Sequence, residues 1–254
     1  MVSGAVVANL TRPLARRGAV FDGVDDFVDV AHNANQLGAN LTGGFTISAW
    51  VNPKSTGETG AGKILDKSTA DGGADGFTYR IDANKKAVLQ INLGTSIRSA
   101  DSSLPFGKWT HVLTTITSAQ IAQHYINGAV SGSAGDLVQG ISAMTTTNDI
   151  RIGNLTGNTN RTWDGAISQV KMWNRVLNST EIAADLAGKE VAGTIIDVPL
   201  QENYDDVTNS GSRLAAIDDQ VASAVSGARV TASDQYMMTF AGDKILTTVV
   251  EEAP

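Results

Sequence analysis

Short runs in which apolar and polar residues alternate extend from residue 18 to about residue 176, separated by Gly, Asn, Asp, Ser and Thr. Segments 45–51 and 109–117 show the alternation clearly, and Asn127-Gly128 is a typical two-residue hairpin turn. This spacing predicts an all-β protein, an antiparallel β-sandwich. The predicted strands are 19–23, 27–31, 45–51, 63–66, 77–81, 87–92, 109–117, 121–126, 149–152 and 163–173.

One short helix is predicted after the last of these strands, at residues 178–186. Asn178, Ser179 and Thr180 are typical N-cap residues, and Glu181 falls in the first turn. Gly188 follows the last turn and is a typical helix stop.

The chain divides into three parts. Residues 1–17 contain three arginines and no acidic residue, which predicts a basic, extended N-terminal arm. Residues 18–188 form the predicted sandwich. Residues 189–254 are strongly acidic and form a C-terminal extension, with further strands predicted at 193–200 and 245–250 and an apolar segment at 236–240. This extension either completes the sheet of its own sandwich or contacts a neighbouring molecule.

Composition excludes several classes of protein. The 254 residues include no cysteine, so disulfides, thiolate zinc sites and thiol nucleophiles are excluded. The formal net charge is −7 and no basic stripe with interleaved aromatics occurs, so nucleic acid is not an expected partner. No apolar run approaches the roughly 18–20 residues of a membrane span. Basic residues follow the mildly apolar start, the reverse of a secretory signal, so neither membrane insertion nor export by such a signal is expected.

Six motifs carry a resemblance to a known family. They occupy residues 18–28 (GAVFDGVDDFV), 45–51 (FTISAWV), 108–112 (KWTHV), 125–128 (YING), 150–154 (IRIGN) and 165–177 (GAISQVKMWNRVL). In this order they resemble laminin-G-like domains, which are concanavalin A-like jelly rolls, over roughly residues 18–188. Segment 195–202 resembles the strand with which such domains usually begin. Many members of the family bind carbohydrate, and related domains occur on bacteriophage particles as head decoration or tail-associated proteins.

The resemblance also implies a structural calcium ion, with Asp22 as one ligand. An Asp often stands in the family where this chain has Ser168. Calcium prefers several carboxylate or carbonyl oxygens, so Ser168 is a poor substitute. We therefore expect no required cofactor and keep Asp22 as a candidate metal ligand.

Catalytic chemistry is not expected, so we predict a protein that is not an enzyme. A glycosidase needs two carboxylates about 5–9 Å apart across the scissile bond. Glu58, in a Gly-rich loop, is the single Glu before the helix, and no predicted strand carries alternating acids. Asp26 and Asp29 are expected to be solvated turn residues, and His111 to be structural. No nucleophile elbow or phosphate-binding loop is present.

Aromatic rings that stack on a sugar are the remaining candidates for binding. Trp163 lies near a loop and is the first candidate for an exposed ring, followed by Tyr79 and Tyr125. The other three tryptophans fall inside the family motifs, where core packing is expected.

Two functions remain open. The first, which we favour, is a structural protein of a bacteriophage virion surface, made in the host cytoplasm and released by lysis. Arg12, Arg16 and Arg17 would then pair with carboxylates on copies of the protein or on other virion proteins. The second is a carbohydrate-binding module or lectin that acts on cell-surface glycan, with an extracellular location as the alternative.

Size-exclusion chromatography with light scattering tests whether the terminal segments drive assembly. If the arms drive assembly, residues 1–254 should form a defined oligomer while residues 18–188 remain monomeric. Two monomers would contradict assembly by the arms.

Overall fold

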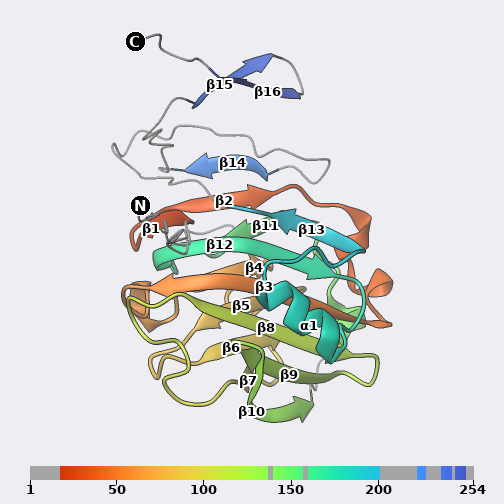
Figure 1. Cartoon of the computed structure of the whole chain (residues 1–254). Coiled ribbons are helices and arrows are strands. Elements are labelled where there is room, and N and C mark those ends of the chain that lie inside the picture. The colour runs from red at the N-terminus through yellow and green to blue at the C-terminus, as the bar shows by residue number, and fades with distance from the viewer. Residues whose placement is uncertain are drawn as a thin grey trace, which may run out of the picture.

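Two antiparallel β-sheets face each other in the computed structural model of the protein (Figure 1). It describes residues 18–136, 140–156 and 160–200 and, beyond these, the strands at 222–226, 236–241 and 244–249. Sheet A has the strand order β1 (Ala19–Asp22), β12 (Asp164–Trp173), β3 (Gly44–Pro53), β8 (Thr110–Thr117), β9 (Ile121–Ile126) and β10 (Ala129–Asp136), and β13 (Thr194–Val198) also pairs with β12. Sheet B has the order β14 (Ala222–Ser226), β2 (Phe27–Val30), β11 (Ile150–Ile152), β4 (Lys63–Lys67), β5 (Phe77–Ile81), β6 (Ala87–Ile91) and β7 (Ile97–Arg98).

This architecture confirms the predicted antiparallel sandwich with one short helix. The helix α1 (Ser179–Leu186) begins with a capping box, because the Asn178 side chain accepts from the backbone N–H of Glu181 and the Glu181 carboxylate accepts from that of Asn178. Asn127 and Gly128 join β9 to β10 with φ angles of 50° and 79°, as a hairpin turn with two left-handed residues requires. The remaining elements are four short 3₁₀ turns, at Ala34–Gln36, Gly38–Asn40, Glu58–Gly60 and Ile141–Ala143, and the hairpin β15 (Tyr236–Ala241) with β16 (Lys244–Val249).

The C-terminal extension contributes strands to both sheets. β13 pairs with the second half of β12, from Val170 to Trp173, beyond the half that pairs with β1. β14 pairs with β2 at the edge of sheet B. A truncation after residue 188 therefore removes β13 from sheet A and β14 from sheet B, so a shortened chain used to test assembly should end after residue 200, which at least keeps β13.

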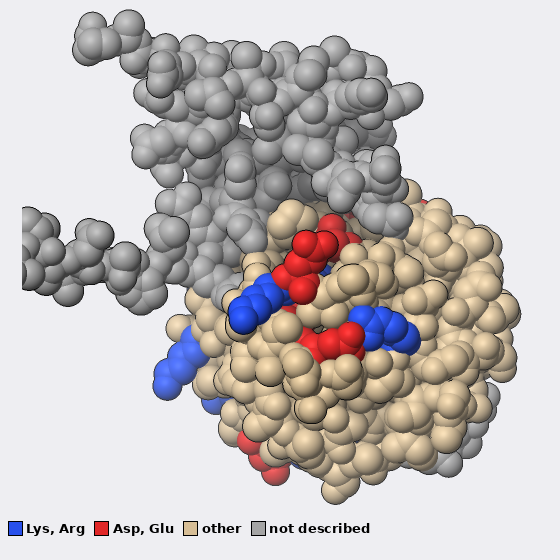
Figure 2. Space-filling view, turned by 45° about the vertical axis from the view of Figure 1, so that its right-hand side comes forward, with Lys and Arg blue, Asp and Glu red and all other residues tan. Residues whose placement is uncertain are grey.

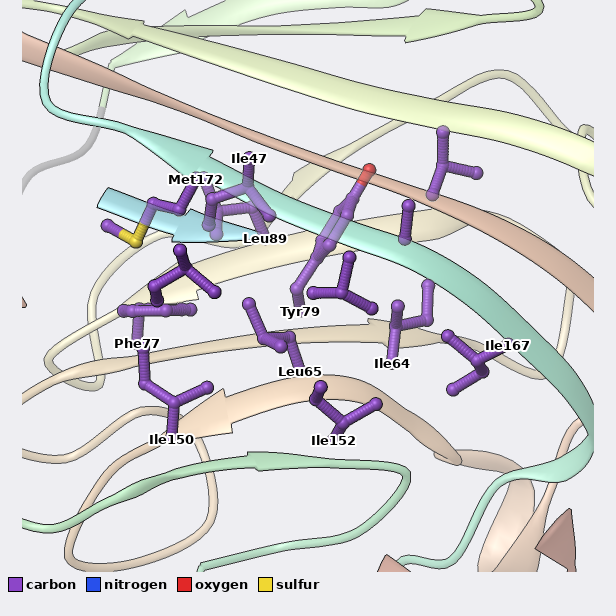
Figure 3. Packing of buried hydrophobic residues seen from close by; sticks show 14 of the residues in the cluster. Ile47, Ile64, Leu65, Phe77, Tyr79, Leu89, Ile150, Ile152, Ile167 and Met172 are labelled. Carbon is purple, nitrogen blue, oxygen red and sulfur yellow. The ribbon is translucent and has the colours of Figure 1, made fainter. Parts of the chain in front are cut away.

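The core between the sheets consists of apolar rows that run across the strands. One row crosses six strands of sheet B, each residue directly opposite the next: Val28, Ile152, Leu65, Tyr79, Leu89 and Ile97. All six are buried. Figure 3 shows four of them packed with Ile47, Ile167 and Met172 from sheet A. Burying these side chains is the main favourable contribution to folding.

The helix α1 covers the outer face of sheet A (Figure 1). Leu113 and Trp173 from the sheet pack against Leu177 and Ile182 in a second apolar cluster. The carboxylate of Asp185 accepts hydrogen bonds from Lys171 at 3.1 Å and pairs with His111 Nε2 at 2.9 Å, deep beneath the helix. The helix has eight residues, and no helix among the described residues is both long and apolar enough to cross a membrane.

His124 of β9 connects the two sheets inside the core. Its Nδ1 lies 2.6 Å from the hydroxyl of Thr114, which is hydrogen-bonded in turn to the hydroxyl of Tyr79 at 3.0 Å. Its Nε2 lies 2.9 Å from the carbonyl oxygen of Ile97, to which it donates. Burial lowers the pKa of His124 to about 4, and the Ile97 carbonyl offsets this in part.

The lowered pKa of His124 makes stability depend on pH. Between pH 6.5 and 4 the unfolded chain protonates this ring while the folded protein does not, so the free energy of unfolding should fall, by on the order of 3 kcal/mol. Replacing His124 with Gln removes the titration, so the variant should lose less stability over that range. Urea unfolding at stepped pH measures both curves, and parallel curves would contradict the prediction.

Candidate functional site

The outer face of sheet B is polar, in contrast to its apolar inner face. Two cross-strand rows lie on this outer face, again with each residue directly opposite the next. The first consists of Asp29, Arg151, Asp66, Thr78 and Gln90. The second, which we call the cationic row, consists of Lys63, Arg80, Val88 and Arg98. The helix α1 lies on the outer face of sheet A, whereas the outer face of sheet B carries no α-helix among the described residues.

The first row contains one largely buried ion pair, between Asp29 and Arg151. Arg151 holds Asp29 with two hydrogen bonds, at 2.7 and 2.8 Å, and its guanidinium lies over the ring of Phe27 at 3.6 Å. Asp29 is therefore not the solvated turn residue that the sequence suggested, because it lies in β2 and only 8% of its surface is exposed. Burial raises the pKa of Asp66, while Lys63 and hydrogen bonds from Ser68 and Thr156 counteract this.

Asp71 neutralises part of the cationic row from a neighbouring loop. It accepts from Lys63 Nζ at 2.6 Å and from Arg161 Nε at 2.9 Å. Burial alone would raise the pKa of Asp71, but these two cations outweigh burial and hold that pKa below its usual value. Burial also lowers the pKa of Lys63, and Asp71 partly offsets this effect.

A pocket of about 500 Å³ lies where the β5–β6 hairpin meets the segment after β7. We call it the hairpin pocket; its lining residues are Ala83, Asn84, Lys85, Lys86, Asp101 and Ser102. Lys86 and Asp101 form an ion pair at 2.7 Å. Beside the pocket, Phe106 is 40% exposed and Lys85 Nζ lies 4.4 Å from the centre of its ring.

Asp82 links the hairpin pocket to the cationic row. Its Oδ1 accepts from the backbone N–H groups of Asn84 and Lys86, at 2.9 and 3.1 Å, which shapes the hairpin turn. Its Oδ2 lies 3.6 Å from Arg98 Nε. Asp82 therefore contacts both the hairpin turn that lines the pocket and Arg98 of the cationic row.

The predicted sugar-stacking rings lie elsewhere. The expectation that Trp163 is exposed is wrong: its backbone N–H donates to Gly153 at 2.7 Å, and its fully buried ring belongs to the main core. Tyr79 is also fully buried, because it lies on the inner face of β5. Tyr125 is partly buried against the cluster beneath α1. None of these three rings is exposed, whereas Phe106, which the sequence analysis did not select, is the aromatic among the exposed large apolar residues of the described chain.

The structure gives Asp22 different neighbours from those the resemblance implied. Asp22 lies opposite Asp164, whereas Ser168 lies four residues further along β12, opposite Trp50, and donates to the carbonyl of Pro199. Instead, the turn after β1 brings Asp22 together with Asp25 and Asp26, so that one ligand oxygen of each lies within 4.8 Å of the others. This oxygen-rich set fits calcium. The ion would cross-link the turn between β1 and β2.

The assembly candidates Arg12, Arg16 and Arg17 lie outside the described residues. His111 is the structural residue that was expected, because it is buried and paired with Asp185. On the face drawn in Figure 2, acidic and basic side chains lie beside one another within an otherwise uncharged surface.

Comparison with known proteins places the chain in a family. The Laminin_G_3 profile, described as the concanavalin A-like lectin/glucanases superfamily, matches residues 22–183. The match spans more than half of the chain, so the protein belongs to this superfamily. No curated protein matches the sequence.

Several solved structures resemble the chain at low sequence identity. A candidate carbohydrate-binding protein of Bacteroides ovatus has a TM-score of 0.62 and 15% identity, over 93% of this chain and 60% of that one. The chain thus spans less than two thirds of that protein. The heptameric SAP-like pentraxin of Limulus polyphemus has a TM-score of 0.50 and 14% identity, over 81% and 97% of the two chains. The CBM40 domain of Ruminococcus gnavus IT-sialidase has a TM-score of 0.48 and 13% identity, over 66% and 96%.

Calcium binding at Asp22, Asp25 and Asp26 can be tested by thermal unfolding. Millimolar calcium should raise the melting temperature by several degrees, because an ion that binds only the folded state stabilises it. Asp25→Asn removes a ligand at a partly exposed position and should abolish most of this increase, whereas Asp101→Asn, far along the chain in the hairpin pocket, should retain it. An unchanged wild-type melting temperature would contradict a calcium site.

Proposed function

We propose that the protein is a carbohydrate-binding module whose ligand occupies the hairpin pocket and the adjoining outer face of sheet B. The observation that carries this proposal is a polar pocket beside an exposed aromatic ring. Sugar rings have apolar faces that pack on aromatic side chains and hydroxyl groups that hydrogen-bond at their edges. Phe106 supplies the ring, and Asn84, Asp101 and Ser102 supply donors and acceptors.

Two further considerations support carbohydrate binding. The superfamily includes lectins by its description, and the Bacteroides ovatus structure is of a candidate carbohydrate-binding protein. The carboxylates nearest the pocket also have cationic partners: Asp101 is paired with Lys86, and Asp82 lies near Arg98. Such pairs suit ligand recognition better than a general acid, which needs a raised pKa.

The bacteriophage-virion role stays a prediction, because neither the fold nor the comparisons address it. It is compatible with glycan binding, since a virion surface protein that binds glycan could hold a particle near a cell. The two roles differ in the expected behaviour of the terminal segments, not in the use of the hairpin pocket.

A glycan array with the full chain, followed by calorimetry on each hit, tests carbohydrate binding. Phe106→Ala should weaken binding of the best glycan by about tenfold or more, the equivalent of burying a Phe ring against the sugar. Val130→Ala is the matched control, because Val130 is 64% exposed on β10 of the other sheet, and it should leave affinity unchanged. If no glycan binds, carbohydrate binding is wrong; if Phe106→Ala binds normally, the pocket is misplaced.

A further inference from the structure

Arg80 lies on β5, on the outer face of sheet B. Its guanidinium makes no hydrogen bond and no ion pair with any described residue. The two other cations of the row have partners, because Lys63 bonds to Asp71 and Arg98 lies near Asp82. The side chain of Arg80 is nevertheless partly buried. Burying a charge that lacks a partner costs free energy.

The neighbours of Arg80 add to this cost. Lys63 lies directly opposite it on β4, and like charges in opposite positions of a sheet repel each other. Burial lowers the pKa of Arg80; Asp71 and Asp82 oppose this shift, while Arg98 and Arg161 reinforce it. An arginine remains charged in a protein all the same.

The nearby carboxylates are already engaged. Asp71 accepts from both Lys63 and Arg161. Asp82 accepts from two backbone N–H groups of the hairpin and lies near Arg98. The described carboxylates near Arg80 therefore already have other partners, and the planar fork of a guanidinium matches the two oxygens of a further carboxylate or of a sulfate.

We propose that Arg80 binds the acidic group of an anionic sugar, one that carries a carboxylate or a sulfate. This inference rests on the proposed carbohydrate-binding function and names the class of glycan. The rest of the glycan reaches the hairpin pocket, which Asp82 connects to the cationic row. The bound anion supplies a directly hydrogen-bonded counter-charge for Arg80 and reduces its repulsion with Lys63.

An arginine kept for a ligand and an arginine that supports the fold differ in how their loss changes the melting temperature. A structural arginine stabilises the protein, so its loss lowers the melting temperature. An arginine kept for a ligand is unfavourable in the unliganded protein, so Arg80→Gln should leave the melting temperature unchanged or raise it. Arg175→Gln is the matched control, because Arg175 bonds to Glu181 and to the Ala192 carbonyl beside α1. It should lower the melting temperature slightly.

Binding is measured by calorimetry on the full chain with matched pairs of probes. The first pair is oligogalacturonate and its methyl ester, and the second is a sulfated galactan oligosaccharide and its desulfated form. We expect one charged probe to bind at least tenfold more tightly than its neutral counterpart, with an affinity that falls as salt is added. The pair that responds distinguishes carboxylate from sulfate.

The variants then assign the preference to Arg80. Arg80→Gln should reduce the charged-to-neutral preference at least tenfold, and Arg80→Lys should restore only part of it, because an ammonium lacks the fork. Arg175→Gln should keep the full preference.

Equal binding of charged and neutral probes, or an Arg80→Gln variant that keeps the preference, overturns the anionic ligand and leaves the carbohydrate-binding function intact. A fall of several degrees in the melting temperature of Arg80→Gln also overturns it. If no charged or neutral probe and no glycan of the array binds, the proposed function itself fails.

Discussion

The strand register of sheet B is the constraint on which the rest of the molecule depends. Side chains alternate between the two faces of a strand, so Arg80 lies on the outer face next to the inward-facing Tyr79, and the register shift between Lys63 and Leu65 brings Lys63 opposite Arg80. A shift of one residue would bring these charges into the core and expose the apolar row. The strand register that buries the apolar core therefore also determines which polar residues lie on the outer face of sheet B.

The two outer faces of the sandwich have different roles. Sheet A is closed by α1, whose Asp185 is buried against Lys171 and His111. Burial would raise the pKa of Asp185, but the hydrogen bond and charge of His111 and the charge of Lys171 keep it low. Because this charge cluster is internally paired, it stabilises the docked helix and leaves nothing for a ligand. Sheet B has no helix on its polar face among the described residues, and its cations are only partly paired.

The charge on the outer face of sheet B differs from the net charge of the whole chain. The chain has a formal net charge of −7, yet the cationic row and its loop neighbours bring four basic residues to one face of sheet B. Bulk charge governs solubility and long-range steering, whereas a partly buried cation acts at short range. An acidic protein can therefore contain a site that suits an anion. An unfavourable arrangement of like charges is also what a binding site, rather than a scaffold, is expected to retain.

The sequence by itself determined the features that depend on neighbouring residues: the alternating strands, the Asn127-Gly128 hairpin, the capping box of α1 and the family motifs. These signals arise within a few residues of one another. Only the tertiary structure decided which side chains meet. Arg151 holds Asp29 across 122 residues, the cationic row draws on four strands, and Trp163 enters the core although its local sequence resembles a loop. Periodicity shows that a residue alternates with its neighbours, but which strand lies opposite depends on how distant segments pair and which loops cover them.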